Sequence, residues 1–152
     1  PDRENELLIN KIANSDAVSL HIRRADYVAN SHTNTIRGTC SPDYYHYAVD
    51  KVAEKVQTPH FFIFSDDPAW TLKNLKLKYP ATFVTKNGPD KNYEDLRLMS
   101  LCRHNIIANS TFSWWGAWLN PNPYKTVIAP KKWFNTEKFD AKDVLPESWT
   151  KL

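Results

Sequence analysis

The chain has 152 residues, 41% of them hydrophobic and 24% charged, and its 20 basic and 17 acidic side chains leave a net charge of +3. This composition is typical of one globular domain and excludes collagen-like, low-complexity and wholly disordered chains. No apolar run approaches the ~18 residues of a membrane-spanning helix, and a small net charge without a basic cluster excludes a nucleic-acid partner.

Short apolar segments alternate with longer amphipathic segments along the chain. The pattern predicts helices over 5–14, 42–57, 93–102 and 110–119 and a further helix beginning at Pro68, which Ser65 or Asp67 caps. It predicts strands over 17–22, 61–64, 82–84, 105–108 and 126–129, with a polar loop over 30–41. The alternation predicts an α/β fold, with a parallel sheet covered by helices on both faces.

Three glycines cannot build a G-x-G-x-x-G or Walker loop, so a phosphate site in this chain must use cationic side chains and helix N-termini. Such sheets bind ligands at the carboxyl ends of their strands, and polar residues follow three of the predicted strands. The first group is H-I-R-R-A-D-Y over 21–27. Arg23 and Arg24 face opposite ways if the strand continues, so we expect one to hold an anion and the other to pair with Asp26 or another carboxylate. The alternative is two surface arginines beside a core His21.

The second group is F-S-D-D-P-A-W over 64–70. Asp66 and Asp67 have no further ligand at a useful spacing, so they make a poor metal site. A helix cap explains Asp67 but not Asp66. Farther along the chain, Glu94-Asp95 begins a helix. An acidic residue there either favours the helix dipole or accepts two N–H bonds from a guanine edge.

The third group is N-S-T-F-S-W-W-G-A-W over 109–118, at a turn from strand to helix. Its hydroxyl side chains and free backbone N–H groups predict an anion site, with Thr111 or Ser113 bonding a phosphate oxygen. Gly116 is expected to allow close contact between helix and sheet. Trp114 and Trp115 are expected to be mostly buried, whereas a carbohydrate-binding domain would expose them.

The remaining reactive side chains have no evident partners in the sequence. Cys40 and Cys102 make no metal or redox spacing and are expected to be free buried thiols. The other histidines are assigned to surface or hydrogen-bonded positions: His32, His46, His60 and His104.

Together, H-x-R-R-x-D-Y, F-S-D-D-P-x-W and N-S-T-F-S-W-W-G-A-W-L resemble the three motifs of glycosyltransferase family 11, the α-1,2-fucosyltransferases. The resemblance covers about 17–133, and its third motif is the most specific. It implies the nucleotide-binding half of a GT-B fold and an inverting transfer of L-fucose from GDP-fucose to the 2-hydroxyl of a galactoside, with no metal and no other cofactor.

Carried over by position, the resemblance assigns Arg23 to the β-phosphate, His21 to the guanine and ribose, and Asp95 to the guanine. Arg23 and Asp26 become the catalytic candidates. The donor-binding set comprises His21, Arg23, Arg24, Asp66, Asp67, Asp95, Thr111 and Ser113.

Members of the family have an N-terminal half before the arginine motif, so residues 1–152 are expected to be the GDP-fucose-binding domain without its acceptor half. The expected partners are GDP-fucose and a galactose-terminated glycan. A bacterial cytoplasmic location is favoured, with membrane or Golgi association if the missing part carries an anchor. The alternative function is a non-catalytic GDP-sugar or carbohydrate-binding module.

Overall fold

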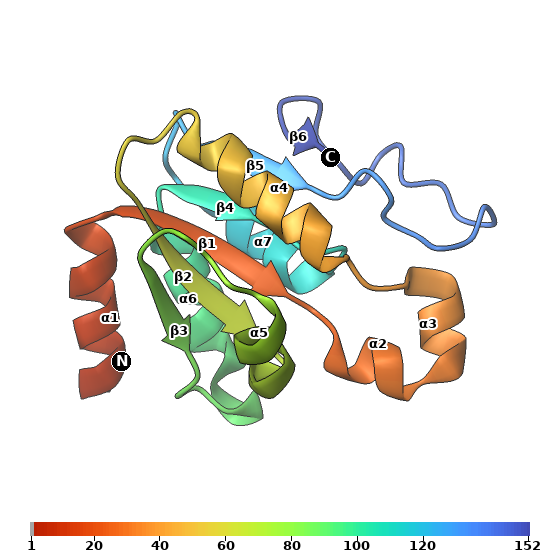
Figure 1. Ribbon diagram of the computed structural model, residues 1–152, viewed down its shortest axis with the longest axis horizontal. Coiled ribbons are helices and arrows are strands. Elements are labelled where there is room, and N and C mark those ends of the chain that lie inside the picture. Colours follow the sequence, from red (N-terminus) through yellow and green to blue (C-terminus); the bar gives the residue numbers. More distant parts are fainter. Residues whose placement is uncertain (1) are drawn as a thin grey trace.

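The computed structural model describes residues 2–152 as one parallel six-stranded sheet in the order β3-β2-β1-β4-β5-β6 (Figure 1). The strands are β1 (Asp16–Ile22), β2 (Pro59–Ser65), β3 (Ala81–Val84), β4 (His104–Ile106), β5 (Val127–Ala129) and β6 (Thr150–Lys151). The helices are α1 (Arg3–Ala13), α2 (Ala25–Ala29), α3 (Ser31–Arg37), α4 (Pro42–Ala53), α5 (Pro68–Asn74), α6 (Asn92–Leu101) and α7 (Thr111–Trp118), with a 3-10 turn η1 (Pro89–Lys91).

The predicted α/β class is confirmed, and this strand order is the Rossmann order. Strands β2 and β3 are added on one side of β1, and the order then reverses, so that β4 to β6 are added on the other side. Each predicted strand and helix lies within a few residues of its expected place. Asp67 caps α5, because its Oδ1 accepts a hydrogen bond from the Trp70 amide at 3.0 Å. None of the helices within residues 2–152 is long and apolar enough to cross a membrane.

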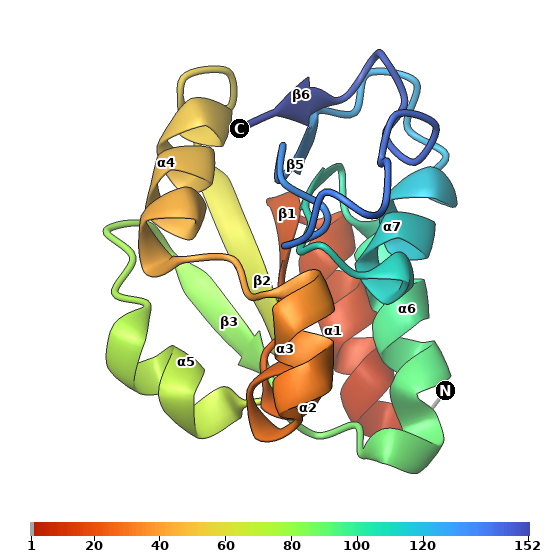
Figure 2. The ribbon, with the colours of Figure 1, turned by 90° about the vertical axis from the view of Figure 1, so that its right-hand side faces the viewer.

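Side chains alternate across β1 and β2, and each face of the sheet has its own helices. Val18, Leu20 and Ile22 pack toward α4, whereas Ala17 packs with Phe62 and Phe64 toward α1 and α6. Figure 2 shows α4 and α5 on one side of the sheet and α1, α6 and α7 on the other. Both faces are therefore buried, and β1 lies at the centre with its carboxyl end directed toward α2 and α3 (Figure 1).

The prediction of a loop over 30–41 is wrong, because α3 forms there. Asn30 caps this helix by accepting a hydrogen bond from the Thr33 amide at 3.1 Å, and Gly38 ends it with a φ of +64°. Both residues are typical helix-end signals, but the polar stretch between them lacks the apolar stripe by which a surface helix is recognised.

Gly116 allows a close contact between two helices rather than the expected contact between helix and sheet. A Cβ atom at this position would lie 2.9 Å from Met99 Cβ and 3.2 Å from Met99 Sδ. Met99 belongs to α6, so the glycine sets how closely α7 approaches α6.

Gly116→Ala is expected to lower the free energy of unfolding by about 1–3 kcal/mol, because the new methyl group overpacks this contact more than the helix propensity of alanine offsets. Urea unfolding measures the change. Gly88→Ala is the matched control, since nothing lies within 4 Å of its Cβ position and its φ of −80° suits alanine. Equal stability of both variants would show that the contact between the helices does not require glycine.

Candidate functional site

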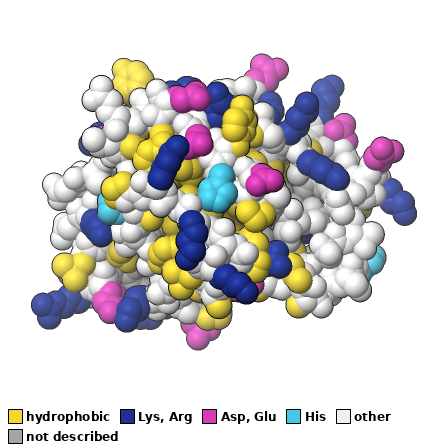
Figure 3. Space-filling model, viewed as in Figure 1, with side chains coloured by type: hydrophobic (Ala, Val, Ile, Leu, Met, Phe, Trp, Pro, Cys, Tyr) yellow, Lys and Arg dark blue, Asp and Glu magenta, His cyan; other side chains and the backbone are white. Residues whose placement is uncertain are grey.

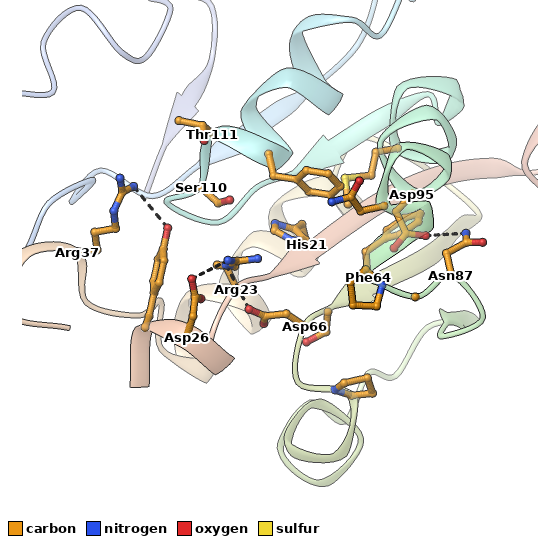
Figure 4. A pocket seen from close by; sticks show the side chains of 18 of the residues that line it. His21, Arg23, Asp26, Arg37, Phe64, Asp66, Asn87, Asp95, Ser110 and Thr111 are labelled. Atoms are coloured by element: carbon orange, nitrogen blue, oxygen red, sulfur yellow. Dashed lines mark hydrogen bonds and ion pairs between the residues drawn. The ribbon is translucent and has the colours of Figure 1, made fainter. Parts of the chain in front are cut away.

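A cavity of about 700 Å³ opens at the carboxyl edge of the sheet, within the size range of sites for small molecules and cofactors. Its walls come from the ends of β1 and β2, the start of α7, the helices α2 and α3, and the segment from Asn87 into α6 (Figure 4). This is the point where the strand order reverses, which is the usual ligand site of an open α/β sheet.

Six of the nine predicted site residues line this one cavity: the donor-binding candidates His21, Arg23, Asp66, Asp95 and Thr111 and the catalytic candidate Asp26. They come from four separate segments of the chain, and Figure 4 shows Arg23 between Asp95 at one end and Arg37 at the other.

Three expected residues lie outside the cavity lining. The Arg24 guanidinium stacks 4.2 Å from the centre of the Trp70 ring and lies 3.8 Å from Asp67. Asp67 caps α5, as described above. Ser113 is 1% exposed, and its hydroxyl donates to the Ser110 carbonyl at 3.3 Å. Ser110, one turn earlier, lines the cavity in its place.

Arg23 is held by two carboxylates within the cavity. Its Nη2 donates to Asp26 Oδ2 at 2.7 Å, and its Nε lies 3.2 Å from Asp66 Oδ2. The other arginine pairs with another carboxylate, as expected, since Arg24 lies 3.8 Å from Asp67. Asp26, in the first turn of the short helix α2, pairs with Arg23 instead. Burial opposes the charge of Arg23, but the Asp26 hydrogen bond and the Asp66 charge outweigh it and raise the pKa of the guanidinium.

The two carboxylates differ in how firmly they are held. Asp66 accepts hydrogen bonds from the backbone amides of Arg24 at 2.8 Å and Ala25 at 3.2 Å, so it joins the end of β2 to the turn after β1. Its side chain is 21% exposed, whereas that of Asp26 is 55% exposed and pairs only with Arg23 among the described residues. Asp66 is therefore the fixed partner of Arg23, and Asp26 is the exchangeable one.

His21 is 4% exposed and lines the cavity, and its ring centre lies 5.6 Å from that of Phe112. Burial, aided by the charge of Arg23, lowers the pKa of His21 to about 3, so the imidazole is neutral. Its Nδ1 atom has no hydrogen-bond partner within residues 2–152. A buried nitrogen of this kind is suited to a hydrogen bond with a ligand.

The structure separates the two acidic residues at the start of α6. Asp95 lines the cavity and accepts a hydrogen bond from Asn87 Nδ2 at 2.8 Å, whereas the buried Glu94 lies 3.5 Å from Arg97. Burial raises the pKa of Asp95 to about 6 against the lowering effect of the Asn87 bond, and the charge of Glu94 adds to the rise.

Two polar residues that the sequence did not single out, Asn87 and Arg37, also line the cavity. Asn87 falls in a segment read only as a loop, and it also bonds Asn5 at 3.0 Å. Arg37 ends the unpredicted helix α3, and its position depends on Asn109, whose Nδ2 donates to the Arg37 carbonyl at 2.8 Å. The sequence signal for Arg37 is the glycine after it, which marks a helix end.

The expectation that Trp115 is mostly buried is wrong, since it is 49% exposed. Trp114 is partly buried and donates from Nε1 to the Val144 carbonyl at 2.7 Å. One face of α7 carries the small residues Gly116 and Ala117 and packs against the protein interior. The bulkier Trp115 and Trp118 therefore face solvent.

Both cysteines are free, as predicted, with Cys102 buried and Cys40 partly exposed. Among the described residues, no group of three or more His, Cys, Asp or Glu side chains is placed to hold a metal ion. On the face shown in Figure 3, Lys and Arg side chains are scattered among Asp and Glu.

The strand order defines a Rossmann-like domain with a charged cavity where that order reverses. The chain belongs to glycosyl transferase family 11, whose family model matches residues 3–152. The protein is therefore a member of a glycosyltransferase family, and the predicted resemblance is confirmed.

The chain is similar to glycosyltransferases whose names specify two different sugars, colitose and fucose, or no sugar. The O-antigen biosynthesis glycosyltransferase WbnK of Escherichia coli is 42% identical over 80% of this chain and 40% of its own length. The alpha-1,2-colitosyltransferase of the same species is 38% identical over 91% and 48%. The mouse galactoside 2-alpha-L-fucosyltransferase Sec1 is 28% identical over 82% and 38%. The chain thus spans less than half the length of these relatives.

Proposed function

We propose that this chain is the donor-binding half of an inverting, metal-independent galactoside α-1,2-fucosyltransferase of GT-B architecture, with GDP-fucose as its donor. The observation that carries the proposal is the Arg23 guanidinium, which faces the cavity at the carboxyl end of the central strand. The family membership and the names of the relatives support sugar transfer.

Transfer breaks the bond between the sugar C1 and the β-phosphate oxygen, and negative charge develops on the departing GDP. A fixed guanidinium stabilises this charge as a divalent ion does elsewhere. The phosphate replaces the Asp26 carboxylate at Arg23 Nη2, while Asp66 keeps its contact with Nε. The Asp66 contact therefore fixes the direction of the Arg23 guanidinium before the donor binds. Thr111, at the start of α7, offers a hydroxyl to the same phosphates.

Asp95 and His21 bind the nucleoside part of the donor. The Asp95 carboxylate accepts two N–H bonds from the guanine edge, with Asn87 holding it in position. His21 is neutral and its Nδ1 is unpartnered, so it contributes a hydrogen bond without adding charge.

Displacement of Asp26 from Arg23 leaves an exposed carboxylate beside the reacting sugar. A carboxylate in that position accepts the proton of the acceptor hydroxyl as that oxygen attacks C1 from the face opposite the phosphate. Asp26 is thus our candidate for the general base, and GDP leaves with the electron pair of the broken bond.

A second candidate donor is GDP-colitose, a deoxy analogue of GDP-fucose. The named colitosyltransferase matches more of this chain, at higher identity, than the fucosyltransferase does. Both donors share the guanine and diphosphate that the cavity is proposed to hold, so comparing them in one transfer assay decides the sugar.

Calorimetric titration of the chain with GDP, ADP, UDP and galactosides in EDTA tests the proposal. We expect GDP to bind at least tenfold more tightly than ADP or UDP. Binding of galactosides alone would contradict the proposal and favour a carbohydrate-binding module. GDP binding without transfer, even in a chain that includes the acceptor half, would identify a non-catalytic module.

Arg23→Ala is expected to weaken GDP binding by about 10- to 100-fold and to abolish transfer, because a charge-assisted hydrogen bond is worth about 1.5–3 kcal/mol. Calorimetry on this chain measures the first effect, and a transfer assay on a chain that includes the acceptor half measures the second. Arg103→Ala is the control, since Arg103 pairs with Asp16 at the opposite edge of the sheet. An Arg23→Ala variant that transfers fucose at nearly the original rate would refute the phosphate assignment.

GDP-fucose affinity is expected to fall by about tenfold between pH 8 and pH 5. The Asp95 pKa of about 6 lies above its ordinary value, so this carboxylate is ionised and able to bind guanine above pH 6 and is progressively protonated below it. The phosphates of the sugar nucleotide do not titrate in this range. Asp95→Asn should bind more weakly at pH 8 and show no such dependence; an unchanged pH profile in this variant would place the titrating group elsewhere.

A further inference from the structure

The cavity lining offers too little positive charge to a diphosphate if Arg23 is the only cationic side chain that binds it. Two guanidiniums, Arg23 and Arg37, face three carboxylates, Asp26, Asp66 and Asp95. Arg23 is already paired with two of these carboxylates. Within residues 2–152, no carboxylate lies within 4.0 Å of the Arg37 guanidinium, so its charge is available to a ligand.

The backbone of Arg37 is held firmly beside the start of α7. Asn109 Nδ2 donates to the carbonyls of Arg37 at 2.8 Å and Gly38 at 3.2 Å. The amide of Asn135 donates to the Ile36 carbonyl at 2.7 Å. Asn109 immediately precedes Ser110, the N-cap residue of α7, so these bonds place the end of α3 next to the N-terminus of α7.

The side chain of Arg37 makes only weak contacts with the rest of the protein. Its Nη1 donates to the Tyr27 hydroxyl at a long distance of 3.5 Å, and its guanidinium carbon lies 5.8 Å from the centre of the Tyr27 ring. The guanidinium carbon of Arg23 lies 5.6 Å from the same ring centre. Both guanidiniums thus lie beside one tyrosine ring in the lining of the same cavity, and most of the five N–H donors of Arg37 remain free.

The N-terminus of α7 adds free donors at the same end of the cavity. Ser110 makes no side-chain cap bond to the first turn, and Ser110 and Thr111 both line the cavity. In Figure 4, Arg37 and Thr111 lie on the side of Arg23 away from Asp95. If guanine binds at Asp95, this side meets the phosphate that carries the sugar.

We propose that Arg37 is the second guanidinium ligand of the donor and binds its β-phosphate from the side opposite the guanine, together with the first turn of α7. The inference rests on the proposed GDP-sugar site. Arg23 and Arg37 then offset the charge that develops on the leaving diphosphate, and Asn109 is the residue that positions Arg37.

Titration of the whole chain with GDP, GMP and guanosine tests the inference, because only GDP carries the β-phosphate. Arg37→Gln keeps a side-chain N–H for Tyr27 but removes the charge. It should weaken GDP binding by about tenfold or more and leave GMP and guanosine binding within about twofold. Arg37→Lys should recover part of the GDP affinity, since lysine keeps the charge without the forked donors. Arg103→Ala again serves as the control, and thermal unfolding verifies that each variant is folded.

The possible results separate the two claims. Unchanged GDP affinity in folded Arg37→Gln would overturn the inference and leave the proposed function intact. Equal weakening of GDP, GMP and guanosine would also overturn it, because Arg37 would then act on the shape of the cavity rather than on the β-phosphate. If the unaltered chain binds GDP no better than guanosine, the proposed function fails and the inference fails with it.

Discussion

The site depends on one interaction, the contact of the Asp66 carboxylate with the turn after the central strand. This single side chain accepts hydrogen bonds from the backbone amides of Arg24 and Ala25 and also contacts Arg23 Nε. It therefore fixes both the backbone path and the direction of the guanidinium. Two parallel strands separated by a long crossover are thereby joined at the edge where a ligand binds. Asp66 is partly shielded from water, so its hydrogen bonds to the turn are stronger than those of a fully exposed carboxylate.

The arrangement places an exchangeable carboxylate beside a fixed one. Asp26 is exposed and bonds Arg23 through Nη2, so an incoming phosphate competes with a solvated partner rather than with a buried one. In our proposal this exchange orients the phosphate and frees a carboxylate for the acceptor in the same step. The family membership supports sugar transfer as the reaction in which this exchange takes place. We expect the acceptor to bind to the part of the longer relatives that lies outside the matched region.

Much of the fold follows from sequence periodicity, because buried parallel strands are apolar runs that stand out from amphipathic helices. The carboxyl-edge rule also places candidate residues near one another, and six of them line one cavity. The direction in which each side chain points is harder to predict from the sequence. Ser113 points inward and Trp115 outward because of the phase of α7, a helix that is apolar on nearly every side. Arg37 was missed because α3 has no apolar stripe, so neither its helix nor its place beside Asn109 was evident in the sequence.

A crystal structure of the chain with GDP and EDTA tests the central claim most directly, since it shows which group the Arg23 guanidinium contacts. The account predicts a phosphate oxygen within hydrogen-bond distance of Arg23 Nη2, with Asp26 displaced and Asp66 still bonded to the turn after β1. GDP bound away from this edge of the sheet, or Arg23 still bonded to Asp26 with no phosphate contact, would contradict it.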